Sequence, residues 1–401
     1  MLFTKSGPKP EPENFERVIA RLDEQQGLAS SGALVTPTKA MQQATAYACV
    51  RIISEAIAGL EPTLWRRNGR EWVQVETHPV IDLWHRPNNW MTSHEFWALV
   101  LMHQELRGNF YSYKVRGGNG RVSELLPLMP TGVTVEQLYD WSIRYYVADK
   151  RARVSGTHSP REIFHCKWIS DDGVVGIPTI TYHRESIGLA LQTERHGASM
   201  FRNGTTLGLI FKHPGHLKQE AADRLSQGLQ KFRGATNAGK NLVIEDGMTV
   251  EKLGMTADDA QFLETRQFQR EEIASIFGVP PFMLGMTEKA TTWGSGLETI
   301  LRQFVTQSLQ PRIDRLEQSL ERHFLSESEQ RTHEIRIDTD QLTRGTLGEQ
   351  LRALGIGTDR GILSINEARS KIKMNAIENG DEHRVPMNTT PAGTSDENET
   401  P

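Results

Sequence analysis

Apolar residues recur at steps of three and four in several long segments, which predicts amphipathic helices. The first, AMQQATAYACVRIISEAIAGL, carries an apolar stripe that ends before Pro62. The second, SHEFWALVLMHQELRGN, has Ser93 as its predicted N-cap and Gly108 as its predicted end. Between and after them, TLWRRNGREWVQV predicts a hairpin turning on Asn68-Gly69, and FYSYKVRGGNGRVSELLPL predicts another. Up to about residue 176 the pattern therefore indicates an α+β domain.

The character of the pattern changes after residue 176. Residues 179–203 predict one long helix with charges on several sides, which suits a helix with neighbours and no single deep core. A second long helix, ADDAQFLETRQFQREEIASIFG, should begin at an N-cap of Asp258 or Asp259 and stop at Pro280. A compact unit of strand, helix and hairpin separates the two. The pattern thus predicts an antiparallel stalk with a small lobe between its helices.

Residues 285–296, GMTEKATTWGSG, predict a loop with glycines at both ends. A third long helix follows, with Pro311 in its middle, where proline should kink it. Then come a strand, HEIRIDT, and two shorter helices split by GIGTDRGI. Residues 1–43 are polar and rich in Pro, Gly and Ser, which predicts a mobile arm, and residues 376–401 predict a disordered tail.

Composition narrows the possible functions. The 401 residues, 37% hydrophobic and 24% charged, are ordinary for a soluble globular protein of about two or three domains. A net charge of −4 argues against a protein that grips nucleic acid by bulk positive charge, although one that only surrounds DNA remains possible. Cys49 and Cys166 are too few for a disulfide framework or a zinc site. No apolar run approaches the roughly 18 residues that span a bilayer, and no signal-peptide core precedes the first helix. We therefore expect a soluble intracellular protein.

Gly234, Gly239 and Lys240 stand at the spacing of a phosphate-binding loop. Asn241 occupies the place of the Ser or Thr that would hold magnesium. The context is also reversed, because a predicted helix precedes the loop and a hairpin follows it, whereas a phosphate-binding loop joins a strand to a helix. A flexible connection is the favoured interpretation, and a nucleotide hydrolase is the alternative.

Other candidate sites are weak. His165, His183 and His196 lack the spacing of a metal motif, so solvated or core histidines are favoured. Asp171 and Asp172 precede Gly173 as in a turn. No arrangement of Ser, His, Asp or Cys indicates nucleophilic catalysis. The sequence predicts no catalytic residue, cofactor or metal.

Several segments resemble one family in collinear order over roughly residues 40–390. They include AYACVRIISEAIAGL, HPVIDLWHRPNNWMTSHEFW, GNFYSYKV, SDDGVVGIPTI, FLETRQFQREEIASIFGVPPFMLG and RGILSINEARSKI. These segments resemble the portal proteins of long-tailed bacteriophages. The resemblance implies a portal fold with an α/β wing, long stem helices, a small α/β clip and a helical crown.

The resemblance implies a ring, usually of twelve subunits, at one capsid vertex. Such a ring is the conduit for packaging and ejecting double-stranded DNA. Its implied partners are the large terminase subunit, the major capsid protein and scaffold, and the head-tail connector, with no membrane. The implied location is the virion, and the host cytoplasm during assembly. A non-portal capsid protein is a further alternative.

The regions are assigned by matching the family order to the predicted elements. They are the arm (1–43), wing (44–176 and 297–339), stem (177–203 and 258–284), clip (204–257), tunnel loop (285–296), crown (340–375) and tail (376–401).

The resemblance also assigns candidate site residues. The DNA-facing tunnel-loop residues are Met286, Thr287, Glu288, Lys289, Thr291, Thr292 and Trp293. The predicted loop hinges are Gly285, Gly294 and Gly296, since glycine permits backbone change. The predicted clip surface for partners is Lys218, Arg224, Lys231, Arg233 and Lys240.

Overall fold

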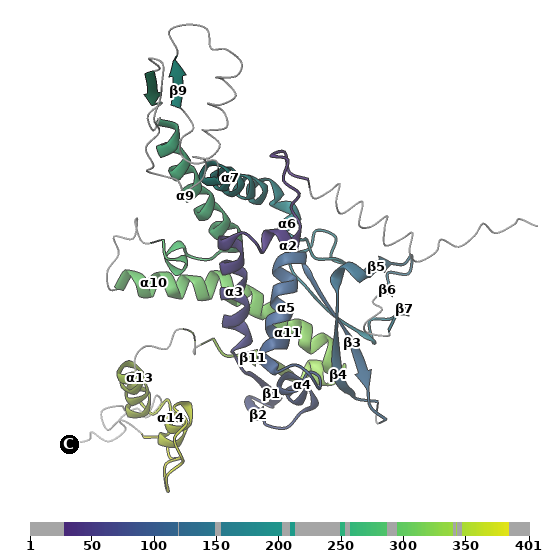
Figure 1. Cartoon of the computed structure of the whole chain (residues 1–401). Coiled ribbons are helices and arrows are strands. Elements are labelled where there is room, and N and C mark those ends of the chain that lie inside the picture. The colour runs from purple at the N-terminus through teal and green to yellow at the C-terminus, as the bar shows by residue number, and fades with distance from the viewer. Residues whose placement is uncertain are drawn as a thin grey trace, which may run out of the picture. The chain divides into compact units, whose positions relative to one another are not determined.

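The computed structural model describes residues 28–118, 120–148, 154–202, 209–212, 249–252, 257–286, 295–339, 342 and 347–384 (Figure 1). The chain divides into two units, residues 1–338 and 339–401, and each is described by itself. The described residues combine helices with small antiparallel sheets, as predicted for an α+β fold. None of the described helices is long and apolar enough to cross a membrane.

Two helices form the centre of the first unit. They are α3 (Ala44–Ala58) and α5 (Ser93–Arg107), which pack together. Gly108 ends α5 in a left-handed conformation, as predicted. The predicted cap Ser93 is wrong by one residue: Thr92 and Glu95 form a capping box, while the Ser93 hydroxyl donates to the Trp84 carbonyl. Apolar side chains of these two helices fill the core between them.

One sheet joins the two ends of the first unit. Its strand order is β11-β1-β2, with β1 (Pro62–Asn68), β2 (Glu71–Val75) and β11 (His333–Ile337). Asn68 pairs with Glu71, so the hairpin turns one residue later than predicted, at Gly69-Arg70. Gly69 has a φ of +63°, which a glycine adopts freely.

A second sheet, of order β4-β3-β8, packs beside a third, of order β5-β6-β7. Tyr111, Leu128, Tyr145, Val147 and Ile163 form the buried apolar cluster between them. The strands are β3 (Asn109–Arg116), β4 (Val122–Leu128), β5 (Val133–Gln137), β6 (Ile143–Val147), β7 (Gly156–His158) and β8 (Ile163–Lys167). Short helices α4 (Pro79–His85) and η1 (Pro130–Gly132) lie between strands in the chain.

A buried hydrogen-bond network holds the end of β8. The Asn109 amide oxygen accepts from the Gly176 N–H (2.7 Å) and lies 2.9 Å from His165 Nε2. That oxygen can only accept, so Nε2 carries the proton. His165 Nδ1 therefore accepts from the Tyr145 hydroxyl at 3.2 Å. Both ring nitrogens of His165 are thus hydrogen-bonded to protein groups, as expected for a core histidine, and neither nitrogen is left to bind a metal.

Acid should destabilise the first unit. Burial lowers the pKa of His103 to about 4 and those of His165 and His323 to about 3. Unfolding lets each bind a proton below its ordinary pKa of 6.5, so stability is complete above that pH and is lost as pH falls toward 3. We expect about 2 kcal/mol lost per histidine between pH 6.5 and pH 5.

Glu317 opposes part of this loss, because burial raises its pKa to about 7 and its protonation stabilises the fold as pH falls from 7. Denaturant titrations at pH 7 and pH 5 measure the balance, and His165→Gln should reduce the acid sensitivity. An unchanged pH dependence in that variant would contradict the assignment.

The long helix predicted over residues 179–203 is two helices. A short α6 (Thr179–Tyr182) precedes α7 (Arg184–Arg202), with His183 between them. The next described elements are paired strands β9 (Leu209–Lys212) and β10 (Thr249–Lys252). The helix α9 (Ala257–Phe277) begins before Asp258 and Asp259, so the predicted N-cap is wrong and both residues lie in its first turn.

The third long helix contains a change of helical pitch. It comprises α10 (Ser295–Gln303), a π-helix η4 (Phe304–Leu309) and α11 (Gln310–Phe324). Pro311 lies in the first turn of α11, directly after the π-helix. A π-helix accommodates local disruption of the regular ladder. The predicted kink at Pro311 thus corresponds to a π-helix that ends two residues before the proline. A 3-10 turn, η5 (Glu329–Arg331), leads to β11.

Residues 28–43, predicted as part of a mobile arm, are packed. Ala29, Ala33 and Val35 are buried, and a short helix, α2 (Pro37–Ala40), follows them. The Ser30 N–H donates to a Glu185 carboxylate oxygen on α7 at 2.9 Å. Gly188 of α7 makes this approach possible, since a Cβ there would lie 2.5 Å from the Ala29 methyl group. The small and polar residues of this segment serve close packing.

The second unit contains α13 (Leu347–Asp359) and α14 (Ile365–Lys371). The helix α13 continues through Gly355 and Gly357, where the sequence predicted a break. A Cβ at Gly357 would lie 3.1 Å from Leu363 Cδ1, so glycine leaves room for this side chain.

The predicted disordered tail begins too early. Residues 376–384 are held to α14, because the Asn366 amide donates to Ile377 O and to Asp381 and accepts from the Ile377 N–H.

Candidate functional site

The helices α7 and α9 lie side by side and form the centre of the candidate site (Figure 1). Polar side chains join them: Gln269 Nε2 donates to Thr193 Oγ1 at 3.0 Å, and Ser186 Oγ donates to Glu272 Oε1 at 2.8 Å. Gln269 is buried, so its hydrogen bond fixes which turns of the two helices face each other. Ile187, Ala190, Ile273, Ala274 and Phe277 add buried apolar contacts.

The root of the predicted tunnel loop is rigid where it is described. Gly278 ends α9 at a φ of +69°, and the Val279 N–H donates to the Ala274 carbonyl at 2.9 Å. A 3-10 turn, η3 (Pro281–Leu284), follows, and Gly285 closes it at a φ of +75°. The loop therefore leaves α9 through a fixed turn, and the chain returns at the start of α10.

Most predicted site residues lie outside the described residues. Of the loop, Gly285 and Met286 are described before the gap, and Gly296 lies in the first turn of α10. The loop residues outside the description are Thr287, Glu288, Lys289, Thr291, Thr292, Trp293 and Gly294. The clip surface also lies outside it, with Lys218, Arg224, Lys231, Arg233 and Lys240, as does the Gly234-to-Lys240 segment.

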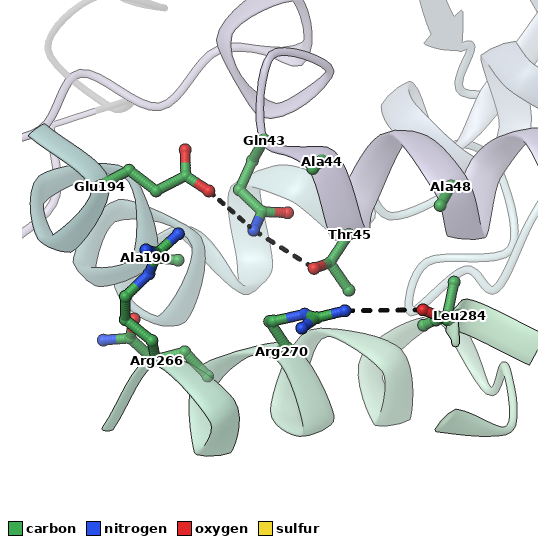
Figure 2. A pocket seen from close by; sticks show the side chains of 10 residues that line it. Gln43, Ala44, Thr45, Ala48, Ala190, Glu194, Arg266, Arg270 and Leu284 are labelled. Carbon is green, nitrogen blue, oxygen red and sulfur yellow. Dashed lines mark hydrogen bonds between the residues drawn. The ribbon is translucent and has the colours of Figure 1, made fainter. Parts of the chain in front are cut away.

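A cleft of about 300 Å³ lies between the start of α3 and the helices α7 and α9. Figure 2 shows the Gln43 amide bridging Glu194 and Thr45, with 3.4 Å to each oxygen. Arg266 and Arg270, one turn apart on α9, line the opposite wall, and an Arg270 N–H points to the Leu284 carbonyl at 3.5 Å. The cleft carries both charge signs. It contains no nucleophile beside a base, and the described residues hold no group of three or more metal-ligating side chains.

A buried joint attaches this site to the rest of the unit. Arg312 of α11 donates to both carboxylate oxygens of Glu105 on α5, at 2.6 and 3.1 Å. It also donates to the Ser308 carbonyl and hydroxyl in the π-helix and to the Phe277 carbonyl at the end of α9. These contacts use every N–H of the guanidinium. The Trp168 ring lies 4.7 Å beneath it.

The joint connects four elements through one side chain. Glu105 is 1% exposed and Arg312 8% by side chain, so water cannot replace either partner. Arg312 donates to the carbonyl of Phe277, the last residue of α9, where a helix leaves its carbonyls without helical partners, and to the Ser308 carbonyl within the π-helix. The position of α9 is therefore fixed against α5 and α11.

The sequence pattern did not single out this joint. Arg312 stands beside Ile313 and among the apolar stripe of α11, and Glu105 lies one turn after Leu101 and Met102 on α5. Each of the two helices carries a charged residue on an apolar face. This pattern could have indicated a buried ion pair, because charged residues are rarely buried unless they are paired.

Comparison with known proteins decides the family. The phage portal protein family model matches residues 44–372, which is most of the chain. The chain belongs to the phage portal protein family. A probable portal protein of Streptomyces phage phiC31 is 32% identical over 382 residues, covering 92% of this chain and 83% of that protein. The portal protein of Enterobacteria phage HK97 is 28% identical, covering 86% and 82%. The predicted resemblance is confirmed.

Solved structures confirm the portal fold. The neck of a native gene transfer agent particle computed with C12 symmetry contains a chain with a TM-score of 0.58 and 21% identity, covering 90% of this chain and all of that one. An HK97 family phage portal protein from Corynebacterium diphtheriae has a TM-score of 0.56 at 15% identity, covering 77% and 97%. Portal proteins form a structural, non-enzymatic family.

Proposed function

We propose that this portal protein assembles into a ring of twelve subunits at one vertex of a phage capsid, and that double-stranded DNA passes through its centre during packaging and ejection. The observation that carries the proposal is the family match across residues 44–372 together with the paired helices α7 and α9 beside the loop root. The twelvefold neck of the similar gene transfer agent chain supports the subunit number.

The described surface of the stalk supports assembly. Leu189 on α7 and Leu263 and Phe268 on α9 are 48%, 63% and 66% exposed. Large apolar side chains on adjacent helices are typical of a surface that another chain covers. A head-to-tail contact between identical subunits closes into a ring when its rotation divides a full turn. We assign α7 and α9 to the stem.

The remaining regions follow from this assignment. Residues 44–176 and 297–339 are the wing, 204–257 the clip that meets the terminase motor and the head-tail connector, and 340–375 the crown. Residues 285–296 face the DNA. A net charge of −4 suits a conduit, because strong phosphate clamps would hold DNA that must slide. The protein has no nucleotide hydrolase activity of its own, which a hydrolysis assay with Lys240→Ala tests.

Particle mass and shape test the ring. Light scattering of the purified protein should give about twelve times the 45.2 kDa mass of one chain, and electron microscopy should show rings with a central channel. Replacing Phe268 with Asp should shift the protein toward smaller species, because a charge on a covered apolar surface opposes association. A folded monomer, or a particle without a channel, would refute the proposal.

A further inference from the structure

The hairpin between β5 and β6 ends in two aromatic side chains that none of the described residues covers. Tyr139 is fully exposed and Trp141 is 79% exposed. They flank Asp140, so two large rings project from three consecutive residues. Trp and Tyr are the residues that most often dominate binding energy at protein interfaces, because each gives a large contact area at a small entropic cost.

Trp141 occupies a backbone position at the hairpin tip where glycine is the usual residue. Leu138 N–H donates to Ser142 O, which leaves Tyr139, Asp140 and Trp141 as a three-residue loop. The third position of such a loop is left-handed and is normally glycine. Trp141 stands there at a φ of +66°. A bulky residue in this conformation is strained, and its exposed ring gains little from burial within the chain. Stability of the fold alone would favour glycine.

The tip is held in a defined shape. Asp140 Oδ1 accepts from both the N–H and the hydroxyl of Ser142, at 3.0 and 2.6 Å. The Trp141 N–H donates to the Leu138 carbonyl at 2.9 Å. A tip with fixed backbone loses little conformational freedom when it binds. Because the Asp140 carboxylate is already used within the turn, the two rings are the groups left for recognition.

The charge of the hairpin excludes a phosphate backbone as the ligand. The loop itself carries Asp140 and no Lys or Arg. On the adjacent strands Glu136 accepts from the Tyr146 hydroxyl at 2.7 Å, and Arg144 points to the same hydroxyl at 3.4 Å. Binding to nucleic acid requires cations facing the phosphates. The chemistry of the tip instead fits an apolar pocket on a protein.

The position of the hairpin in the first unit indicates which protein it binds. In the first unit β5 and β6 lie on the side far from α10, where the chain returns from the tunnel loop (Figure 1). With the loop at the ring axis, as the proposed function requires, the hairpin faces outward. The capsid shell surrounds a ring placed at a vertex. We propose that Tyr139 and Trp141 are anchors that insert into an apolar pocket of the coat protein at the portal vertex.

Trp141→Gly separates this role from a structural one. Glycine adopts the backbone conformation freely, so we expect the thermal unfolding midpoint to stay the same or rise, and the ring to form normally. Incorporation into particles, measured on coexpression with the coat protein of the same phage, should fall at least tenfold. Trp90→Ser is the matched control, because Trp90 is an exposed Trp (58%) in the same unit that lies between α4 and α5 and not in the hairpin. Normal incorporation of Trp141→Gly would overturn the proposal.

A photo-crosslinking residue at position 139 identifies the partner directly. In assembled particles, peptides of the coat protein should be joined to the hairpin, and high salt should not abolish the crosslink because no ion pair is involved. Crosslinks only to a second copy of this chain, only to DNA or only to lipid would each overturn the proposal. Failure of the wild-type chain to form rings would instead refute the proposed function on which this inference rests.

Discussion

Replacing Arg312 with Met is expected to destabilise the first unit by about 3–5 kcal/mol, since Glu105 is then left as an unpaired buried charge. Three carbonyl and hydroxyl acceptors on Ser308 and Phe277 lose their donor in the same variant. Arg312→Lys should also destabilise, because an ammonium group offers three donors from one point and cannot reach the same acceptors together. Denaturant titration of the purified protein measures both effects.

Two control variants test whether the loss of stability in Arg312→Met comes from the buried ion pair. Arg302 forms an exposed ion pair with Glu298, so Arg302→Met should change stability by less than about 0.5 kcal/mol. The double variant Glu105→Leu with Arg312→Met removes both buried charges and should be more stable than Arg312→Met alone. Equal losses in the single and double variants would show that the ion pair is not the source of the effect.

The Arg312 joint fixes the end of α9 to neighbouring helices of the first unit. The end of α9, the π-helix, α5 and α11 meet at the same guanidinium, so none of them can shift without breaking buried hydrogen bonds. The turn η3, which leads toward the predicted tunnel loop, begins four residues after Phe277. The chain that enters this turn is therefore attached to α5 and α11 through buried hydrogen bonds. A loop that contacts moving DNA would need such an attachment.

The predicted helices and hairpins are largely those observed, because periodicity reports which face of an element is buried. The errors lie where tertiary packing outweighs local preference. Residues 28–43 look like a flexible arm by composition, yet their small side chains fit against Gly188. At Gly357 of α13 the absence of a side chain leaves room for Leu363, since a Cβ there would lie 3.1 Å from Leu363 Cδ1. Neither contact can be read from neighbouring residues in the chain.

The sequence predicted which segments form the candidate site, but it did not predict which side chains contact each other there. The stalk and the loop root follow from helix length and from the glycine at position 285. The cleft beside Gln43 does not, since its walls come from positions about 150 and 225 residues further along the chain. The Arg312 joint was missed for the same reason. A charge in an apolar stripe indicates a buried partner without identifying it.

Replacing Gly108 with Ala is the second change with a large expected effect. Gly108 belongs to the GNFYSYKV segment and meets SDDGVVGIPTI at Gly176, so two segments that identified the family contact each other. A Cβ at position 108 would overlap the carbonyl groups of Gly176 and Ile177. The φ of +73° adds strain for any side chain. Because the obstructing atoms are backbone, they cannot rotate away.

The expected loss in Gly108→Ala is about 3–5 kcal/mol, from a left-handed alanine and overpacking together. Gly120→Ala is the matched control: its φ is +75°, but among the described residues nothing beyond its chain neighbours lies within 4 Å of the added carbon, so only the strain of about 1 kcal/mol remains. Thermal unfolding of both variants separates the two contributions. If the midpoints fell equally, the close approach of the two segments would not stabilise the wing. A larger loss at position 108 would show that the close approach of the Gly176 and Ile177 backbone requires a glycine there.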